Sequence, residues 1–217
     1  MRIIIVFDEF QRLRGVLKRE IENAISYCFD YLDNITFILS GSEMGLLYET
    51  LEKPESPLYG RAYIPIPTRK LNRNESIDFL HKGFNQLNIS ISESEIEEAV
   101  DNLNGIIGWL TYFGYSKWKN GKTLSEIKRE AVNLARKELE NLIKYRMSRR
   151  YPIVLRLLAK GIRSWSKLKK EIEKIEKREV SDRVLHDILN QLKKHSIINE
   201  ELKFTDPIVK EAAKTIK

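Results

Sequence analysis

Two acidic residues, Asp8 and Glu9, stand directly after an apolar run near the start of the sequence. The run at 3–7 reads IIIVF, and its β-branched and aromatic residues without alternation predict a strand buried on both faces in a parallel sheet. A strand end can hold Asp8 where its carboxylate orients Mg²⁺ or its waters, while Glu9 can polarise a water that attacks a γ-phosphate. The alternative is a buried strand that happens to end at two acids.

A second apolar run, at 35–39, closes on Ser40, Gly41 and Ser42. Between the two runs, apolar residues at spacings of three and four predict a helix over about 16–32. Strand, helix and strand in this order form a βαβ unit with a right-handed crossover. Ligands of open α/β sheets lie at the carboxyl ends of the strands, so Ser40 and Ser42 are further candidates for the same site.

The stretch 52–68 contains four of the six prolines and ends in a strand-like piece at 62–66. After it the patterns are helical. Asn74 is predicted to cap one helix, and Ser92 with Glu95 to form the capping box of another. The chain therefore changes from α/β to mainly α after about residue 70.

The C-terminal third is basic and reads as a winged helix-turn-helix. Residues 144–217 contain 20 Lys and Arg against 10 Asp and Glu, a net charge of +10, within a total of +7 for the chain. Helices are predicted at 151–160, 165–177 and 181–194, followed by two short strands around 199–202. The alternative explanation of the charge is a lysine-rich solvated surface.

Such a domain can place its third helix in the major groove of DNA, or it can bind another protein. Asp182 and Asp187 on that helix count against DNA, whereas the net charge favours it. The predicted DNA-contacting side chains are Arg163, Lys167, Lys169, Lys170, Arg183, Asn190, Lys193 and Lys194.

Three further segments follow the acidic strand end in a fixed order. They read LSGSEMGLLY at 39–48, SPLYGR at 56–61 and GIIGWLTYFG at 105–114. With Asp8-Glu9 as a Walker B-like motif, this order is similar to that of the archaeal ATPase family within the AAA+/STAND branch of P-loop NTPases. The resemblance covers almost the whole chain and implies an ATPase core, a helical lid and a C-terminal winged helix.

The resemblance also implies roles for single residues. Asp8 would bind Mg²⁺, Glu9 would activate water, and Ser40 or Ser42 would be the sensor beside the γ-phosphate of ATP. Arg61 stands where related ATPases place an arginine finger for a neighbour's nucleotide. The alternative for Arg61 is a salt-bridged loop arginine.

Two features depart from the family pattern. The Walker B-like strand starts at residue 3, so that no phosphate-cradling Walker A loop precedes it, and Ile107 stands where the lid of the family has a proline. Gly121-Lys122-Thr123 has Ser116, not glycine, five positions before its glycine, and is predicted to be a turn. We therefore expect a fragment that lacks the Walker A portion, hydrolyses no ATP alone, and self-associates or binds a partner through its uncovered sheet.

These observations predict an α/β plus mainly α fold in three parts. They are a partial P-loop NTPase sheet at 1–70, a helical lid and linker helix at 71–143, and a winged-helix domain at 144–217. The single cysteine, Cys28, excludes an internal disulfide and is expected to be a small core residue, and with three histidines it argues against a Cys/His zinc site. No apolar stretch is long enough for a membrane span, which predicts a soluble, cytoplasmic protein.

Two functions follow from these predictions. The first is an AAA+/STAND-type ATPase that couples ATP binding and hydrolysis to a winged-helix effector. The second is a non-catalytic DNA-binding or protein-interaction module that retains only a remnant of the sheet.

Overall fold

The computed structural model describes residues 1–146 and 148–216, except for the side chains of residues 145 and 146. The chain divides into two compact units. The sheet unit contains residues 1–66 and 186–198, and the helical unit contains the described residues of 67–185 and 199–217. The three-part division expected from the sequence stays a prediction. None of the helices described is long and apolar enough to cross a membrane.

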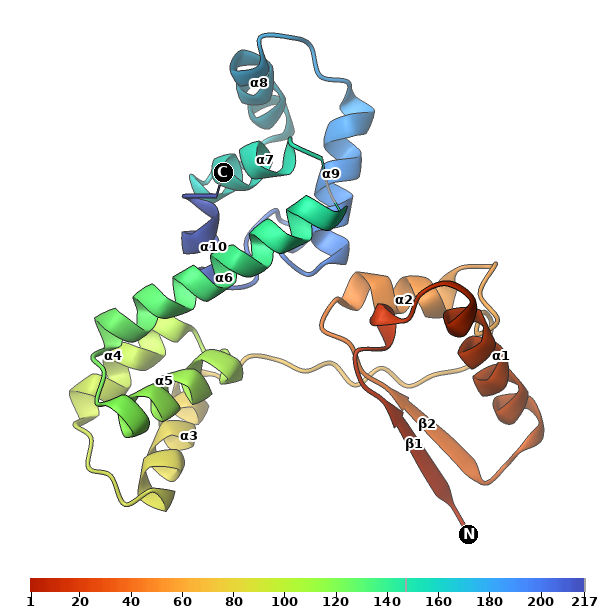
Figure 1. Cartoon of the computed structure of the whole chain (residues 1–217), viewed down its shortest axis with the longest axis horizontal. Helices are drawn as coiled ribbons and strands as arrows, with labels where there is room; N and C mark the ends of the chain where they lie inside the picture. Colours follow the sequence, from red (N-terminus) through yellow and green to blue (C-terminus); the bar gives the residue numbers. More distant parts are fainter. Residues whose placement is uncertain (147, 217) are drawn as a thin grey trace. The chain divides into compact units, whose positions relative to one another are not determined.

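The sheet unit is built around the predicted βαβ unit (Figure 1). Strands β1 (Ile3–Phe7) and β2 (Ile35–Leu39) pair in parallel, with Ile3 opposite Ile35 and Phe7 opposite Leu39. Helix α1 (Gly15–Tyr31) connects them, after a short 3₁₀ helix, η1 (Phe10–Arg12), and α2 (Met44–Glu52) follows β2. Because the strands run in register, their carboxyl ends lie side by side.

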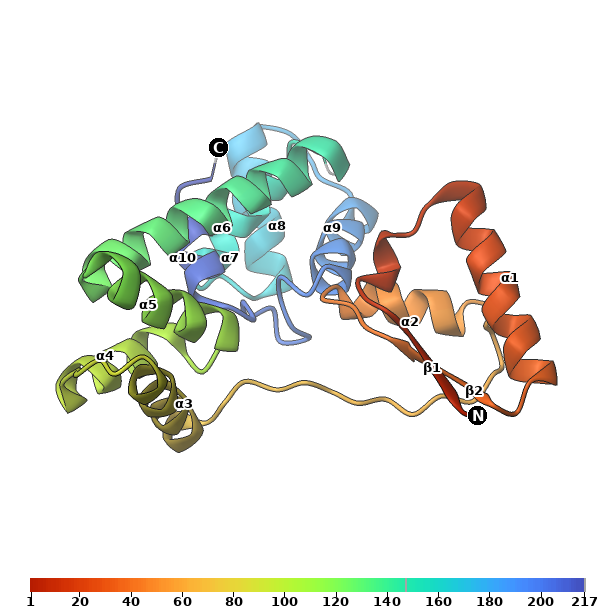
Figure 2. The same ribbon diagram turned by 60° about the horizontal axis from the view of Figure 1, so that its bottom comes forward.

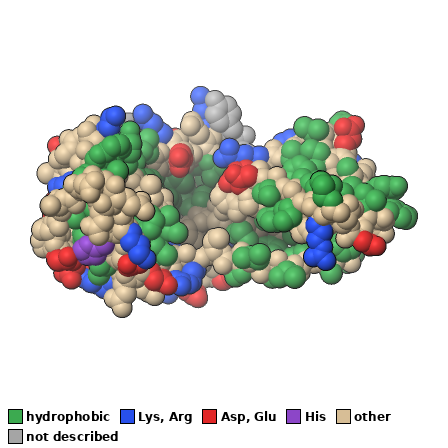
Figure 3. Space-filling model, turned by 90° about the horizontal axis from the view of Figure 1, so that it is seen from below, with side chains coloured by type: hydrophobic (Ala, Val, Ile, Leu, Met, Phe, Trp, Pro, Cys, Tyr) green, Lys and Arg blue, Asp and Glu red, His purple; other side chains and the backbone are tan. Residues whose placement is uncertain are grey.

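Only one face of this two-stranded sheet is covered. Phe7, Phe37 and Leu39 pack against a small core formed by Phe10, Ile25, Leu47 and Leu58. On the opposite face, Ile4 is 66% exposed, Val6 60% and Ile38 45%. The expectation of strands buried on both faces is therefore wrong for the described residues, and hydrophobic side chains lie on the surface of the sheet unit (Figure 3).

The strand expected at 62–66 is not formed. This segment is extended without a pairing partner, and both Ile64 and Ile66 are more than 80% exposed. Pro65 has no backbone N–H to donate to a sheet, so pairing would lose a hydrogen bond there. The apolar residue types predicted a strand, but the segment does not pair with another strand, and Pro65 disfavours such pairing.

The helical unit, seen from a second side in Figure 2, has a core of buried apolar side chains. Its first four helices are α3 (Arg73–Gln86), α4 (Glu93–Leu103), α5 (Ile107–Asn120) and α6 (Leu124–Arg146). Its fully buried side chains, each at most 1% exposed, include Leu103, Leu110, Phe113, Ile127, Leu155 and Leu168. The change from α/β to helical structure agrees with the sequence prediction.

Ser92 is confirmed as the cap of α4, although Glu95 does not return the second bond of a capping box, and the cap predicted for α3 is corrected. Ser92 caps α4 by accepting a hydrogen bond from the backbone N–H of Glu95. Helix α3 is capped by Asn72, not Asn74, because Asn72 and Glu75 form a reciprocal capping box at the helix start. Asn74 lies inside the first turn of α3.

The C-terminal part has the predicted order of three helices and a small hairpin. The helices are α7 (Tyr151–Ala159), α8 (Trp165–Glu176) and α9 (Asp182–Lys194). The two expected strands shrink to single bridge residues, Ile198 and Phe204, and the N–H of Asn199 donates to the carbonyl of Lys203 at 2.8 Å. Helix α10 (Pro207–Ala213), capped by Asp206, follows.

Candidate functional site

The carboxyl ends of β1 and β2 meet and bring Asp8 and Ser40 together. The backbone N–H of Ser40 donates to the carbonyl of Phe7, and the N–H of Phe10 donates to the carbonyl of Ser40, both at 2.9 Å. These bonds continue the hydrogen bonding between the two strands beyond their carboxyl ends. The polar residues that follow the strands are therefore held on a rigid edge.

Asp8 is held by two donors. Its Oδ1 accepts hydrogen bonds from the Ser40 hydroxyl and, at 3.0 Å, from the backbone N–H of Glu9. The residue is exposed, so its carboxylate is open to solvent. Among the described residues no group of three or more His, Cys, Asp or Glu could hold a metal ion. A Mg²⁺ ion here would take Asp8, the Ser40 hydroxyl, waters and phosphate oxygens, which suits a hard cation that keeps several waters.

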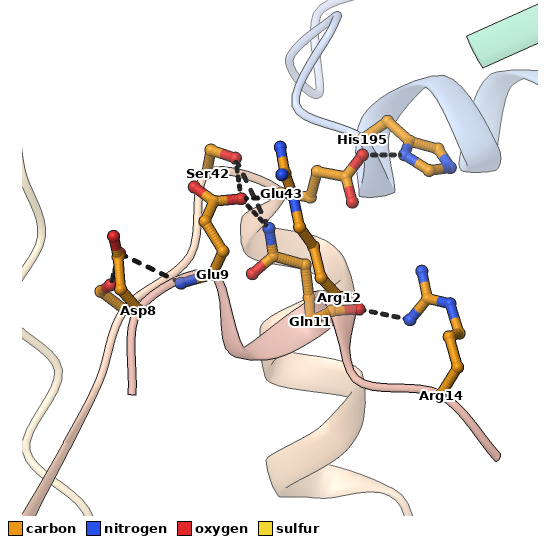
Figure 4. A network of polar contacts seen from close by, with 9 residues as sticks. Asp8, Glu9, Gln11, Arg12, Arg14, Ser42, Glu43 and His195 are labelled. Atoms are coloured by element: carbon orange, nitrogen blue, oxygen red, sulfur yellow. Dashed lines mark hydrogen bonds and ion pairs between the residues drawn. The ribbon is translucent and has the colours of Figure 1, made fainter. Parts of the chain in front are cut away.

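Glu9 is held by three donors (Figure 4). Its Oε2 accepts from the Gln11 Nε2 at 2.7 Å and from the Ser42 hydroxyl at 3.0 Å, and the Arg12 Nε lies 3.3 Å away. Its backbone is left-handed, with φ 52°, which turns the chain sharply from β1 into η1. All three donors contact the same oxygen, Oε2, and a carboxylate can accept about four hydrogen bonds, so Glu9 can polarise a water without losing them.

Gln11 is the buried support of this cluster, and sequence analysis missed it. The residue is 2% exposed, and its Oε1 has no hydrogen-bond partner among the described atoms. A Cβ at Gly41 would lie 2.3 Å from this oxygen, so the glycine lets the loop after β2 pass over the Gln11 amide. The only signal in the sequence was its place two residues after Glu9, which does not distinguish a support from a loop residue.

Arg61 lies away from this cluster and is engaged within the sheet unit. Its Nε and Nη2 contact the two carboxylate oxygens of Asp30 at 3.1 and 2.5 Å, and its Nη1 donates to the carbonyl of Pro57. Asp30 lies in the last turn of α1, which leads to the amino end of β2. Asp8 lies at the opposite ends of the strands, so the structure does not bring Arg61 to the cluster of its own chain.

Gly121, Lys122 and Thr123 form the junction between two helices. Gly121 is the left-handed C-cap of α5, and the Lys122 ammonium donates to Glu130 at 2.7 Å. The Thr123 N–H and hydroxyl both donate to Glu126 at 2.9 Å. The prediction of a turn is confirmed, because the backbone and side chains that could cradle a phosphate are used in helix capping.

The predicted DNA-contacting residues fall into two groups. Arg163, Lys167 and Lys170 are exposed on or just before α8, and Arg183 is exposed on α9. Lys174 is also exposed, and its spacing from Lys167 and Lys170 places the three lysines on one face of α8. Sequence analysis missed Lys174, although the spacing was a usable signal.

The remaining predicted residues are half-buried rather than exposed. The Lys169 ammonium donates to Asp182 at 2.9 Å, and this hydrogen bond raises the pKa of Lys169 and lowers that of Asp182. The side-chain amide of Asn190 lies 3.1 Å from a ring nitrogen of His186. Lys193 is half-buried, and Lys194 donates to Glu49 in the sheet unit at 3.2 Å. Fewer cations are therefore available to phosphates than the sequence suggested.

Comparisons with known proteins find relatives for the N-terminal half of the chain and for its C-terminal part. Residues 1–113 match the family model of an ATPase domain predominantly from Archaea, and residues 146–203 match that of the C-terminal winged helix-turn-helix domain of MCM proteins. The solved structure of a Walker-type ATPase of Pyrococcus abyssi is 34% identical, with a TM-score of 0.87. The alignment covers 98% of this chain and 63% of that one, so the chain spans less than two thirds of its relative's length. No curated protein matches.

Proposed function

The chain belongs to the ATPase-domain family found predominantly in Archaea, and from this premise we propose that its strand-end cluster is part of an AAA+/STAND-type ATP site. Asp8 is the Mg²⁺ ligand, Glu9 activates water, and either Ser40 or Ser42 is the sensor beside the γ-phosphate. The observation that carries the proposal is the hydrogen bonding of the two acids to these serines, Ser40 with Asp8 and Ser42 with Glu9. When bound, Mg²⁺ would neutralise charge on the phosphates.

A second part of the proposal is that these 217 residues alone do not turn ATP over. Tight binding of phosphates needs a nest of backbone amides from a glycine-rich loop. The sequence contains no such motif, and the only Gly-Lys-Thr triplet caps helix α6. The remaining acids and hydroxyls can orient a metal and water but cannot hold the triphosphate.

The experiment compares the chain with its variants Asp8→Asn and Asp33→Asn. Mn²⁺ binding, measured by water-proton relaxation, should weaken at least about tenfold in Asp8→Asn, because a carboxylate ligand becomes an amide. Asp33→Asn is the control, since Asp33 is exposed before the amino end of β2. The rate of ATP hydrolysis by the wild-type chain should equal that of the Glu9→Gln variant, because neither protein is expected to turn ATP over. Turnover by the chain that survives Glu9→Gln would contradict the role of Glu9, and equal Mn²⁺ binding by all three proteins would contradict that of Asp8.

We also propose that the uncovered face of the sheet is a contact surface, for a second copy or for a partner that completes the sheet. The support is the row of exposed side chains Ile4, Val6 and Ile38. Ile4→Lys should shift the chain toward a monomer in analytical ultracentrifugation. Ile175→Lys is the control, because Ile175 is 51% exposed on α8. A wild-type chain that is monomeric and stays soluble at high concentration argues against the proposal.

For the winged helix, we propose DNA binding with phosphate contacts from the exposed face of α8. The support is the row Lys167, Lys170 and Lys174 together with Arg163. Duplex binding should weaken steeply as salt rises, because each phosphate contact releases counterions. Binding that does not depend on salt, or no binding at low salt, overturns this proposal.

A protein partner is the second candidate for the winged helix. It is favoured by the acidic residues on the surfaces that would approach DNA. Asp182 and Asp187 lie exposed on α9, and Glu200 and Glu201 lie exposed in the turn between Ile198 and Phe204. A winged helix that retains a partner at high salt but does not bind duplex DNA would favour this candidate.

A further inference from the structure

The end of α9 is joined to the start of α2 by three polar contacts. Within the sheet unit, the backbone N–H of Met44 donates to the Ser196 hydroxyl at 3.1 Å, and the His195 Nδ1 lies 2.7 Å from Glu43 Oε1. The Lys194 ammonium, on the last residue of α9, donates to Glu49 within α2 at 3.2 Å. Lys194 and the two residues that follow it thus each contact α2 or the residue before it.

The His195–Glu43 pair is shielded from solvent. The His195 side chain is only 5% exposed, and that of Glu43 is 20% exposed (Figure 4). Burial raises the pKa of Glu49, but hydrogen bonds from Lys53 and Lys194 outweigh it, so that its pKa is lowered overall. Glu49 is therefore a carboxylate at neutral pH and remains paired with the two lysines.

Gly45 supplies an independent observation from the backbone. A Cβ at this position would lie 2.5 Å from the Cα of Lys194 and 3.1 Å from its carbonyl oxygen. Both are backbone atoms, which cannot move aside without moving α9. The glycine in the first turn of α2 is thus what permits this close approach.

We propose that this contact and DNA binding by the end of α9 exclude one another. The inference rests on the proposed DNA-binding function of the winged helix. Glu43 and Glu49 give His195 and Lys194 the anionic partners that phosphates would otherwise provide. Lys194 cannot pair with Glu49 and neutralise a phosphate at the same time, and the close approach of α2 at Gly45 leaves no room for a second partner beside the Lys194 backbone. The chain's own α2 is therefore the competitor of DNA for this end of α9.

The test uses Gly45→Ala, with Gly83→Ala as the matched control. Both exchanges replace a helical glycine and favour the helix itself, but a Cβ at Gly83, in α3, meets nothing within 4 Å. In fluorescence anisotropy with a labelled duplex at low salt, Gly45→Ala should bind about fivefold tighter than the wild type. Gly83→Ala should bind like the wild type.

A second pair of variants tests the same contact with charge held constant. Glu49→Gln removes the partner of Lys194, whereas Glu55→Gln removes the same charge from an exposed position just after α2. Because both variants gain one unit of positive charge, general attraction to DNA rises equally. Tighter binding by Glu49→Gln than by Glu55→Gln supports the exclusion.

A readout without DNA reports the contact itself. His195 is shielded, while the His186 side chain is 63% exposed, so carbethoxylation followed by peptide mass spectrometry should modify His186 faster. Gly45→Ala should raise the reactivity of His195 to nearly that of His186, and Gly83→Ala should not. Equal reactivity of the two histidines in the wild type overturns the contact.

The outcomes separate the two proposals. Equal DNA affinity of wild type and Gly45→Ala, with His195 uncovered in the variant, overturns the exclusion and leaves the DNA-binding function intact. No DNA binding by any protein at low salt overturns the DNA-binding function, and with it this inference.

Discussion

The sheet unit and the helical unit differ in how completely they bury apolar side chains and hydrogen-bond buried polar atoms. In the sheet unit, one face of β1 and β2 exposes Ile4, Val6 and Ile38, and Gln11 and Glu22 each have a buried oxygen without a hydrogen bond. In the helical unit the described buried side chains are almost all apolar, and the buried side-chain oxygens that lack a hydrogen bond among the described residues all lie in the sheet unit. The helical unit thus has the composition of a self-sufficient core.

The difference follows from the number of surfaces that a helix and a strand must each cover. A helix needs only one apolar stripe and a partner helix, so a bundle can complete its core from its own segments. A parallel strand has two faces and two edges to satisfy, and two strands with one connecting helix cover only one face. The exposed apolar residues of the sheet unit are therefore the basis of the contact surface proposed above.

The largest expected effect comes from truncating the two cores. Leu155→Ala, at a side chain fully buried in α7, should lower the free energy of unfolding by about 3 kcal/mol because it leaves a cavity. Leu47→Ala in the small core of the sheet unit should cost about 2 kcal/mol or less, since a small half-open core can collapse. Urea unfolding followed by circular dichroism measures both.

The control for this pair is Leu134→Ala, because Leu134 is 44% exposed on α6. Its effect should stay within about 0.5 kcal/mol. A larger loss for Leu47→Ala than for Leu155→Ala would reverse the comparison and make the sheet unit the better packed of the two.

A buried ion pair gives the next largest effect and a pH dependence. Arg150 binds both carboxylate oxygens of Glu176, at 2.7 and 2.8 Å, and their side chains are 21% and 11% exposed. The hydrogen bond from Arg150, with help from Arg178, lowers the pKa of Glu176 from 4.5 to about 2. A lowered folded-state pKa stabilises the protein above the unfolded value, and this stability is lost as the pH falls from about 4.5 toward about 2.

Arg150→Met should therefore lower the free energy of unfolding by about 2 kcal/mol at pH 7. Its stability should also change less than that of the wild type between about pH 5 and about pH 2.5. Urea unfolding at several pH values measures the effect, with the exposed Arg149→Met as control. Parallel stability curves for wild type and Arg150→Met would show that Glu176 does not depend on this partner.

The sequence was sufficient for the elements that local patterns determine. The apolar runs predicted β1 and β2, and the residues after them predicted that Asp8 would lie beside Ser40, because parallel strands in register bring their carboxyl ends together. The helical pattern at 181–194 also predicted α9, whose buried side chains are Leu185, Ile188, Leu189 and Leu192.

Contacts between segments far apart in the sequence could not be predicted. His195 and Glu43 are 152 positions apart, and the sequence alone presents each as an ordinary surface residue. Gln11 was missed because a buried glutamine after a strand end has no local pattern. Asn74 was predicted as the cap of α3 because it precedes an apolar run, but Asn72 does so too, and only the pairing of Asn72 with Glu75 distinguishes them.

The smallest expected effect concerns Arg61. Its pair with Asp30 is partly open to solvent, with side chains 25% and 40% exposed, so Arg61→Gln and Asp30→Asn should each lower stability by only about 0.5 kcal/mol. A double-mutant cycle by urea unfolding measures the coupling between them. A weak coupling would mean that the Arg61–Asp30 pair contributes little to the stability of the fold. The guanidinium could then leave Asp30 for a neighbour's phosphate at little cost, as an arginine finger requires. A coupling above about 2 kcal/mol would identify Arg61 as a structural residue of the sheet unit and remove the support for that role.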